Sequence, residues 1–98
     1  LWANLWLRLM WIYEDLEAEE LALQAAEKAR TYFAESLATT ARSAAGDQRL
    51  YLILAELDLR LGSRGDAYRN FHAAATMTGG DPRIKRMASD RIQDLRAE

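Results

Sequence analysis

Hydrophobic residues recur along this chain at the three- and four-residue spacing of helices with a buried face. Asp81 followed by Pro82 is a strong helix start, because aspartate caps a helix and proline suits its first turn. The spacing breaks near glycines, which commonly end a helix: Gly46, Gly62 and Gly79-Gly80. We therefore predict five helices and no strands, over about 2–16, 19–41, 48–61, 64–77 and 82–97.

Local signals refine two of these boundaries. Residues 43–46 form a predicted loop, and Asp47 is the expected N-cap of the third helix. Ser63 and Asp66 resemble a capping box before the fourth helix, although such a box normally has Glu or Gln at its last position.

The apolar patterns of the helices predict how they pack. The third helix is apolar almost all round, so we expect it to be the most buried. The last helix has one apolar and one charged face, which suits a helix that closes the end of a stack. The first helix has two apolar stripes and is expected to be packed on both sides. One stripe is Trp2, Leu5, Leu9, Ile12 and Leu16, and the other is Trp6, Met10 and Tyr13.

One motif occurs twice in the chain, with an offset of 45 residues. Large residues recur where two helices would meet, and small ones recur where they would cross closely. The pairs are Trp6/Tyr51, Leu9/Leu54, Leu16/Leu61, Ala22/Ala67, Ala26/Phe71 and Ala29/Ala74. The repetition predicts a single domain, residues 1–98, with one helical hairpin over about 2–43, a second over about 47–78 and a capping helix over about 82–97.

The repeated motif resembles the tetratricopeptide repeat. The second copy matches it best, at Tyr51, Leu54, Ala55, Leu61-Gly62, Ala67, Phe71 and Ala74. Asp58 departs from the family, which prefers an aromatic there, and the first copy departs at Met10 and Ala26. The 45-residue offset also exceeds the usual period of about 34. The resemblance implies an all-α, right-handed stack of two antiparallel hairpins plus the capping helix.

A closer resemblance is to a bacterial family of unknown function. The stretches 51–62 and 81–88 and the opening Leu5 to Leu9 are similar to its C-terminal part. In that family a cysteine-rich segment, which looks zinc-binding, precedes a tetratricopeptide-like tail. The chain begins with Leu1 rather than Met, so we expect it to be part of a longer protein whose metal-binding half it lacks.

Residues suited to catalysis or metal binding are scarce. The chain has no cysteine, and His72 is its one histidine, so we predict no metal and no cofactor. A triad of Ser63, His72 and an aspartate would need a nucleophile elbow, which is absent, so we predict that the protein is not an enzyme. An acidic cluster at the first hairpin turn could bind a cation or a basic partner, but a solvated turn is the favoured interpretation. It consists of Glu14, Asp15, Glu17, Glu19 and Glu20.

Charge and hydropathy argue against a nucleic-acid-binding protein and against a membrane-spanning one. The net charge is −2, and the basic residues of the last helix lack interleaved aromatics, so nucleic acid is not an expected partner. The apolar N-terminal run is too short to span a membrane and contains Arg8. It also lacks a signal-peptide cleavage site. We expect a soluble, cytoplasmic protein.

Asp58 is the main anomaly of the repeat. The pattern places it between hairpins, where an unpaired carboxylate would be costly. Either it pairs with an arginine of the last helix, Arg86 or Arg91, or it lies at an exposed edge.

The predicted function is that of a non-catalytic scaffold that binds a protein or peptide on its concave face. Repeat geometry turns one side of each hairpin's first helix toward that face. The predicted partner-binding residues there are Leu7, Trp11, Glu14, Arg49, Leu52, Glu56, Leu59 and Arg60, with Asn4 and Asp15 beside them. The known tetratricopeptide clamp for C-terminal carboxylates has Lys, Asn and Arg at such positions, so Leu7 and Trp11 argue against that ligand.

Two alternatives stay open. The chain could be an assembly domain that associates with a second copy or packs on the missing half, and an enzyme is a distant third. The apolar concave residues Leu7, Trp11, Leu52 and Leu59 could also be buried against the chain's own last helix.

Overall fold

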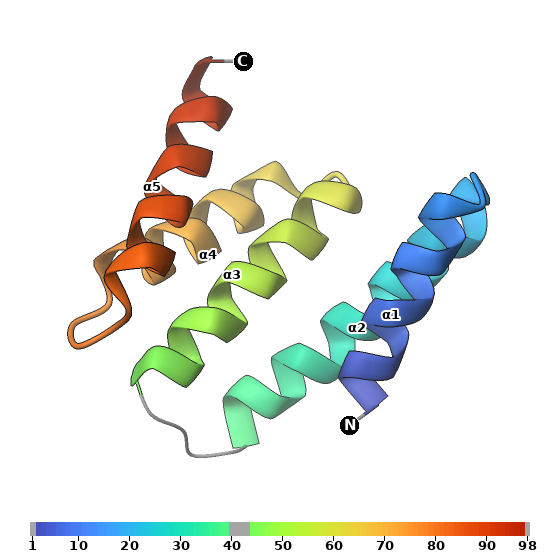
Figure 1. Ribbon diagram of the computed structural model, residues 1–98, viewed down its shortest axis with the longest axis horizontal. Helices are drawn as coiled ribbons and strands as arrows, with labels where there is room; N and C mark the ends of the chain where they lie inside the picture. Colours follow the sequence, from blue (N-terminus) through green and yellow to red (C-terminus); the bar gives the residue numbers. More distant parts are fainter. Residues whose placement is uncertain (1, 40–43, 98) are drawn as a thin grey trace.

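The computed structural model describes residues 2–39 and 44–97, which form five α-helices and, within those ranges, no strand (Figure 1). The helices are α1 (Trp2–Asp15), α2 (Glu19–Thr39), α3 (Ala44–Arg60), α4 (Arg64–Thr76) and α5 (Pro82–Ala97). The predicted all-helical stack is confirmed.

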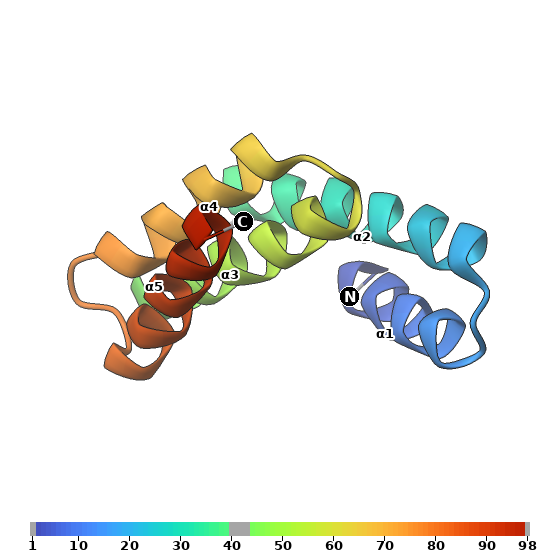
Figure 2. The ribbon, with the colours of Figure 1, turned by 90° about the horizontal axis from the view of Figure 1, so that it is seen from above.

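The helices form two layers, as Figure 2 shows. Helices α1, α3 and α5 lie on the inner side of a bend, and α2 and α4 lie on its outer side. Helix α2 packs on α1 and α3, whereas α4 packs on α3 and α5. Helix α3 is therefore central, and α1 and α5 form the two ends of the stack.

The core has two parts, and α3 contributes to both. The first lies between α1, α2 and α3 and contains Met10, Phe33, Leu54 and Leu57. The second lies between α3, α4 and α5 around Phe71. Alanines fill the helix crossings because a methyl group lets two backbones approach closely. The repeated alanines Ala22, Ala29, Ala67 and Ala74 are all buried, as their places in the motif predict.

Both hairpin turns have the same backbone geometry. Glu17 and Gly62, 45 residues apart, each follow the end of a helix with positive φ, 59° and 77° respectively. The Glu17 and Ala18 amides donate to the carbonyls of Glu14 and Tyr13, and the Gly62 and Ser63 amides donate to those of Leu59 and Asp58. This is the Schellman pattern, which satisfies the last carbonyls of α1 and α3. The two hairpins thus share their turns as well as their sequence motif.

One predicted helix start is wrong, and one predicted capping interaction does not form. Helix α3 begins at Ala44, so residues 44–46 are helical and Asp47 lies within the first turn rather than at the N-cap. Alanine favours helix strongly enough to extend α3 through Gly46. Ser63 occupies the predicted N-cap of α4 but makes no capping hydrogen bond, and its hydroxyl accepts a hydrogen bond from Arg30. Helices α2 and α4 were predicted to end at residues 41 and 77; α4 ends at Thr76, and residues 40–43 lie outside the described residues.

The predicted start of α5 is confirmed. The Asp81 carboxylate accepts a hydrogen bond from the Arg83 amide at 2.9 Å, and the Asp81 carbonyl accepts from the Lys85 amide at 3.1 Å. The Arg83 backbone N–H is the main reason that the pKa of Asp81 lies below its ordinary value.

Candidate functional site

Four charged side chains form a connected row, which we call the charged chain. It crosses the concave face, the inner side of the bend, from α1 to α5. Arg60, near the end of α3, donates from Nε to Glu14 Oε2 of α1 at 2.8 Å. Its Nη1 lies 4.0 Å from Glu56 Oε2, one turn earlier on α3. Arg91 of α5 donates to both carboxylate oxygens of Glu56, at 2.9 and 2.7 Å. Acidic and basic groups therefore alternate across three helices that are far apart in sequence.

Three of the predicted site residues, Glu14, Glu56 and Arg60, belong to this charged chain. Arg91 also belongs to it, but sequence reasoning offered Arg91 as a partner of Asp58 instead. Repeat geometry could have identified Arg91. It places Glu56 on the side of α3 that faces α5, the helix that would open a third hairpin, and Arg91 lies on α5. The guanidinium of Arg91 also lies 5.9 Å from the centroid of the Phe71 ring, a cation–π distance.

Apolar side chains lie beside the charged chain, and Trp11 is the most exposed of the four that were predicted to contact a partner. Trp11 is 49 % exposed. Leu7 is half-buried against the core between α1, α2 and α3. Leu52 and Leu59 are half-buried against the core that includes α5. Leu7, Leu52 and Leu59 are thus partly covered by the two cores, and Trp11 is the most exposed of the four predicted apolar residues.

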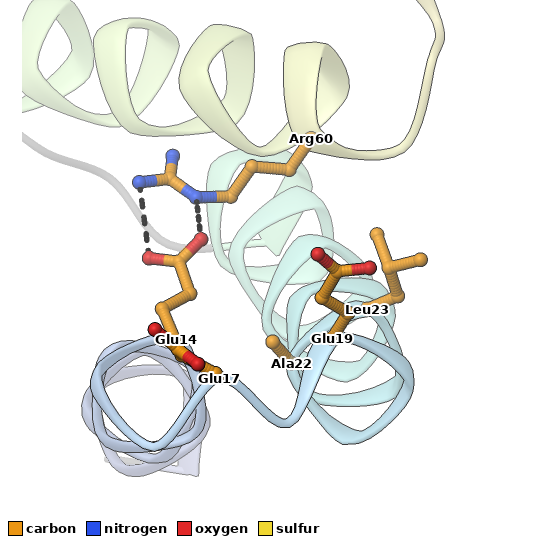
Figure 3. Close-up of a pocket in the computed structure, with 6 residues that line it drawn as sticks. All are labelled: Glu14, Glu17, Glu19, Ala22, Leu23 and Arg60. Atoms are coloured by element: carbon orange, nitrogen blue, oxygen red, sulfur yellow. Dashed lines mark hydrogen bonds and ion pairs between the residues drawn. The ribbon is translucent and has the colours of Figure 1, made fainter.

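A hollow of about 670 Å³ opens where the first hairpin turn faces the last turn of α3. Figure 3 shows Arg60 reaching from α3 to Glu14, while Glu19 and Leu23 project from α2. Its lining holds three carboxylates and one guanidinium, and that guanidinium is already paired with Glu14. The hollow is thus negatively charged. Its lining residues are Glu14, Glu17, Glu19, Ala22, Leu23 and Arg60.

Arg49, the remaining predicted site residue, lies apart from this hollow. It is exposed near the start of α3 and lines a separate hollow of about 470 Å³ with Trp2, Asn4 and Tyr32 among its neighbours. The structure therefore divides the eight predicted residues between the charged chain, the apolar positions beside it and this second hollow.

Asp58 is paired, as predicted, but with other partners. It is 3 % exposed, and its carboxylate accepts hydrogen bonds from Arg30 Nη1 at 3.3 Å and from Asn70 Nδ2 at 2.7 Å. Arg30 lies on α2 and Asn70 on α4, so neither Arg86 nor Arg91 is involved. Asp58 points toward the outer layer of helices, whereas α5 packs on the inner side. Its position indicates a structural link between the two hairpins.

Gln48 is a buried polar residue that sequence reasoning missed. It is fully buried, and its Nε2 donates to the Ala74 carbonyl at 3.0 Å and to the Asp81 carbonyl at 3.2 Å. Its Oε1 accepts from the Asp81 amide at 2.7 Å. A Cβ on Gly80 would lie 2.6 Å from that Oε1, so Gly80 must lack a side chain for this contact to form. Gln48 therefore holds the α4–α5 connection against the start of α3.

Within residues 2–39 and 44–97, no group of three or more His, Cys, Asp or Glu side chains is placed to hold a metal ion. His72 is exposed, and its ring stacks on Tyr68 at a centroid distance of 6.4 Å. No helix in the described part of the chain combines the length and the apolar character needed to cross a membrane.

The fold and this surface define an all-helical stack with a charged concave face. The chain belongs to the bacterial family described as "Uncharacterized protein conserved in bacteria (DUF2225)", whose model matches residues 2–98. This agrees with the predicted membership of a bacterial family of unknown function. A search of curated proteins found no match, and a search of solved structures found none either.

Proposed function

We propose that this chain is a non-catalytic, tetratricopeptide-like scaffold that binds a segment of another protein on its concave face. The observation that carries the proposal is the position of Trp11, half-exposed on α1 one turn before Glu14, which lines the acidic hollow. Residues three apart on a helix lie on the same face, so the indole shares a face of α1 with Glu14 at the edge of the hollow. An exposed aromatic beside a hollow is a typical anchor for a protein ligand.

The charges favour a particular chemistry of ligand. Glu17 and Glu19 are exposed and form no ion pair with another described residue. The guanidiniums of Arg60 and Arg91 already bind carboxylates of the chain itself. The hollow at the edge of the concave face therefore offers free negative charge, which supports a peptide with an apolar side chain next to lysine or arginine. The same charges disfavour a ligand recognised by its C-terminal carboxylate.

The shared turn geometry and the 45-residue register support the tetratricopeptide-like part of the proposal. Both hairpins have a Schellman turn and buried alanines at matching positions. Scaffolds of this kind present the first helix of each hairpin to the ligand.

Selection of peptides from a random library on the immobilised chain tests the proposal. We expect enrichment of sequences with an apolar residue flanked by basic ones, and weaker binding as salt rises. Trp11→Ala should abolish binding of the selected peptides, and Glu17→Gln with Glu19→Gln should weaken it. Met87→Ala is the matched control, because Met87 is exposed to a similar extent (54 %) but lies on α5. Selected peptides that bind Trp11→Ala as well as the unchanged chain would contradict the proposal.

A further inference from the structure

The outer stripe of α1 is exposed, although the sequence predicted a helix packed on both sides. Trp2, Leu5, Ile12 and Leu16 are 61 %, 49 %, 51 % and 70 % exposed. Leu9, in the middle of the stripe, is half-buried against the first core. Large exposed apolar patches usually mark an interaction surface. This stripe lies on the end of the stack rather than on the concave face.

The second hairpin shows what such a stripe does when it has a neighbour. The residues 45 positions after Leu5, Leu9, Ile12 and Leu16 are Leu50, Leu54, Leu57 and Leu61, whereas the counterpart of Trp2 is Asp47. Leu50, Leu54 and Leu57 are buried in the core between the two hairpins, and Leu61 packs against the same core. The stripe of α1 is thus a stacking face, and the described part of the chain provides no helix to cover it.

We propose that a second copy of the chain covers this face, with the two α1 helices packed antiparallel about a two-fold axis. Positions 2, 5, 9, 12 and 16 alternate intervals of three and four residues, which is the heptad spacing of helices that pack in pairs. Antiparallel pairing sets Leu5 against Leu16 of the second copy and Leu9 against Ile12 of the second copy. Each contact occurs twice, as two-fold symmetry requires.

Charges beside the stripe favour this register. Arg8 and Asp15 flank it, both are exposed, and neither is ion-paired with another described residue. The register above brings Arg8 beside Asp15 of the second copy, twice. A shift by one heptad would instead bring Arg8 beside Arg8 of the second copy, and like charges repel.

Two further features fit the same arrangement. A hollow of about 430 Å³ lies beside Leu5, with Trp2, Asn4 and Arg8 also lining it, and Leu16 of the second copy would enter it. The opposite end of the stack does not offer a complementary surface, because the outer side of α5 is mainly charged and Met87 is its one exposed large apolar residue within the described part of the chain. Head-to-tail stacking is therefore disfavoured, and a closed pair is favoured.

Sedimentation equilibrium over a concentration series tests the proposal. An interface with one helix from each copy is small, so we expect a reversible dimer whose population rises with concentration. Ile12→Glu should shift the chain to monomer, with Leu5→Glu as a second variant. Met87→Glu, which adds the same charge at a similarly exposed site, should leave the equilibrium unchanged. Circular dichroism checks that each variant is folded. A chain that stays monomeric at all concentrations overturns the proposal.

A charge swap tests the register separately. Arg8→Asp and Asp15→Arg should each weaken the dimer several-fold, and the double variant should restore it. Failure of the double variant to restore association overturns the register. Trp11→Ala, which removes the proposed peptide anchor, should not change the dimerisation constant. Loss of peptide binding and loss of the dimer are thus distinguishable, because they follow from different faces of α1.

Discussion

Arg91 on α5 and Glu56 on α3 form a two-point ion pair, with donor–acceptor distances of 2.9 and 2.7 Å. The planar guanidinium matches the two carboxylate oxygens, and this geometry fixes orientation as well as distance. The pair connects the capping helix to the central helix on the concave face. It also keeps Glu56 from adding to the free negative charge beside Glu14.

Replacing Arg91 tests this link. Arg91→Lys keeps the charge but loses the two-point geometry, so we expect a loss of about 0.5–1 kcal/mol in the free energy of unfolding. The value is small because both side chains are partly exposed, 42 % and 33 %. Urea denaturation of Arg91→Lys, Glu56→Gln and the double variant gives the coupling energy. Full additivity of the two single effects would show that the two-point geometry contributes nothing.

Asp58 supplies a second prediction. Asp58→Ala leaves Asn70 without its acceptor in a part-buried site and deprives Arg30 of its ion pair, so we expect destabilisation by about 1–3 kcal/mol. Arg30→Ala should cost less, because its side chain is 33 % exposed and Asn70 still binds the carboxylate. Asp58→Tyr, which introduces the aromatic of the tetratricopeptide motif, should also destabilise, since it removes the acceptor for both neighbours. Thermal unfolding of the three variants gives the order, and a neutral Asp58→Ala would contradict it.

The contact between Gln48 and Gly80 gives a third prediction. Gly80→Ala should displace the Gln48 amide and destabilise the fold by about 1–3 kcal/mol, because buried polar groups of the α4–α5 connection lose their partners. Gly65→Ala is the control: nothing lies within 4 Å of its added methyl, and it stands in the first turn of α4, so the change should be neutral or slightly stabilising.

The clash can be separated from any intrinsic effect of alanine at position 80. In a Gln48→Ala background the added methyl has no amide to displace, so Gly80→Ala should then have little effect. Chemical denaturation of the four chains in this cycle measures the difference. An equal cost in both backgrounds would show that the Gln48 contact is not the cause.

Much of this fold could be predicted because its determinants are local or periodic. Gly62 follows the end of α3 and the Asp81-Pro82 pair marks the start of α5, although Gly46 lies within α3. The recurrence of Ala67 and Ala74 at helical spacing marks the crossing of α3 and α4. The 45-residue offset then relates the two hairpins, and the structure reproduces it even in the turns.

The partners of buried polar groups could not be predicted in the same way. The sequence indicates that Asp58 needs a cationic partner, but it contains several arginines that could pair with it. Only the packing of α2 against α3 brings Arg30 to Asp58. Gln48 carries no signal of burial, because its partners are backbone groups of a distant turn. The exposure of the α1 stripe was also missed, since periodicity shows that a face is apolar but not what covers it.

The two hairpin turns provide the last prediction. Substitutions at their equivalent positions, Glu17 and Gly62, should change the free energy of unfolding in opposite directions. Glu17 and Gly62 both have positive φ, which costs a residue with a Cβ about 1 kcal/mol relative to glycine. Glu17→Gly should therefore stabilise the fold by roughly that amount, whereas Gly62→Ala should destabilise it by a similar amount. Glu17→Ala is the control, because it removes the charge from the acidic hollow without relieving the backbone. If Glu17→Ala stabilises the chain as much as Glu17→Gly in denaturant unfolding, charge repulsion rather than backbone strain is the cause.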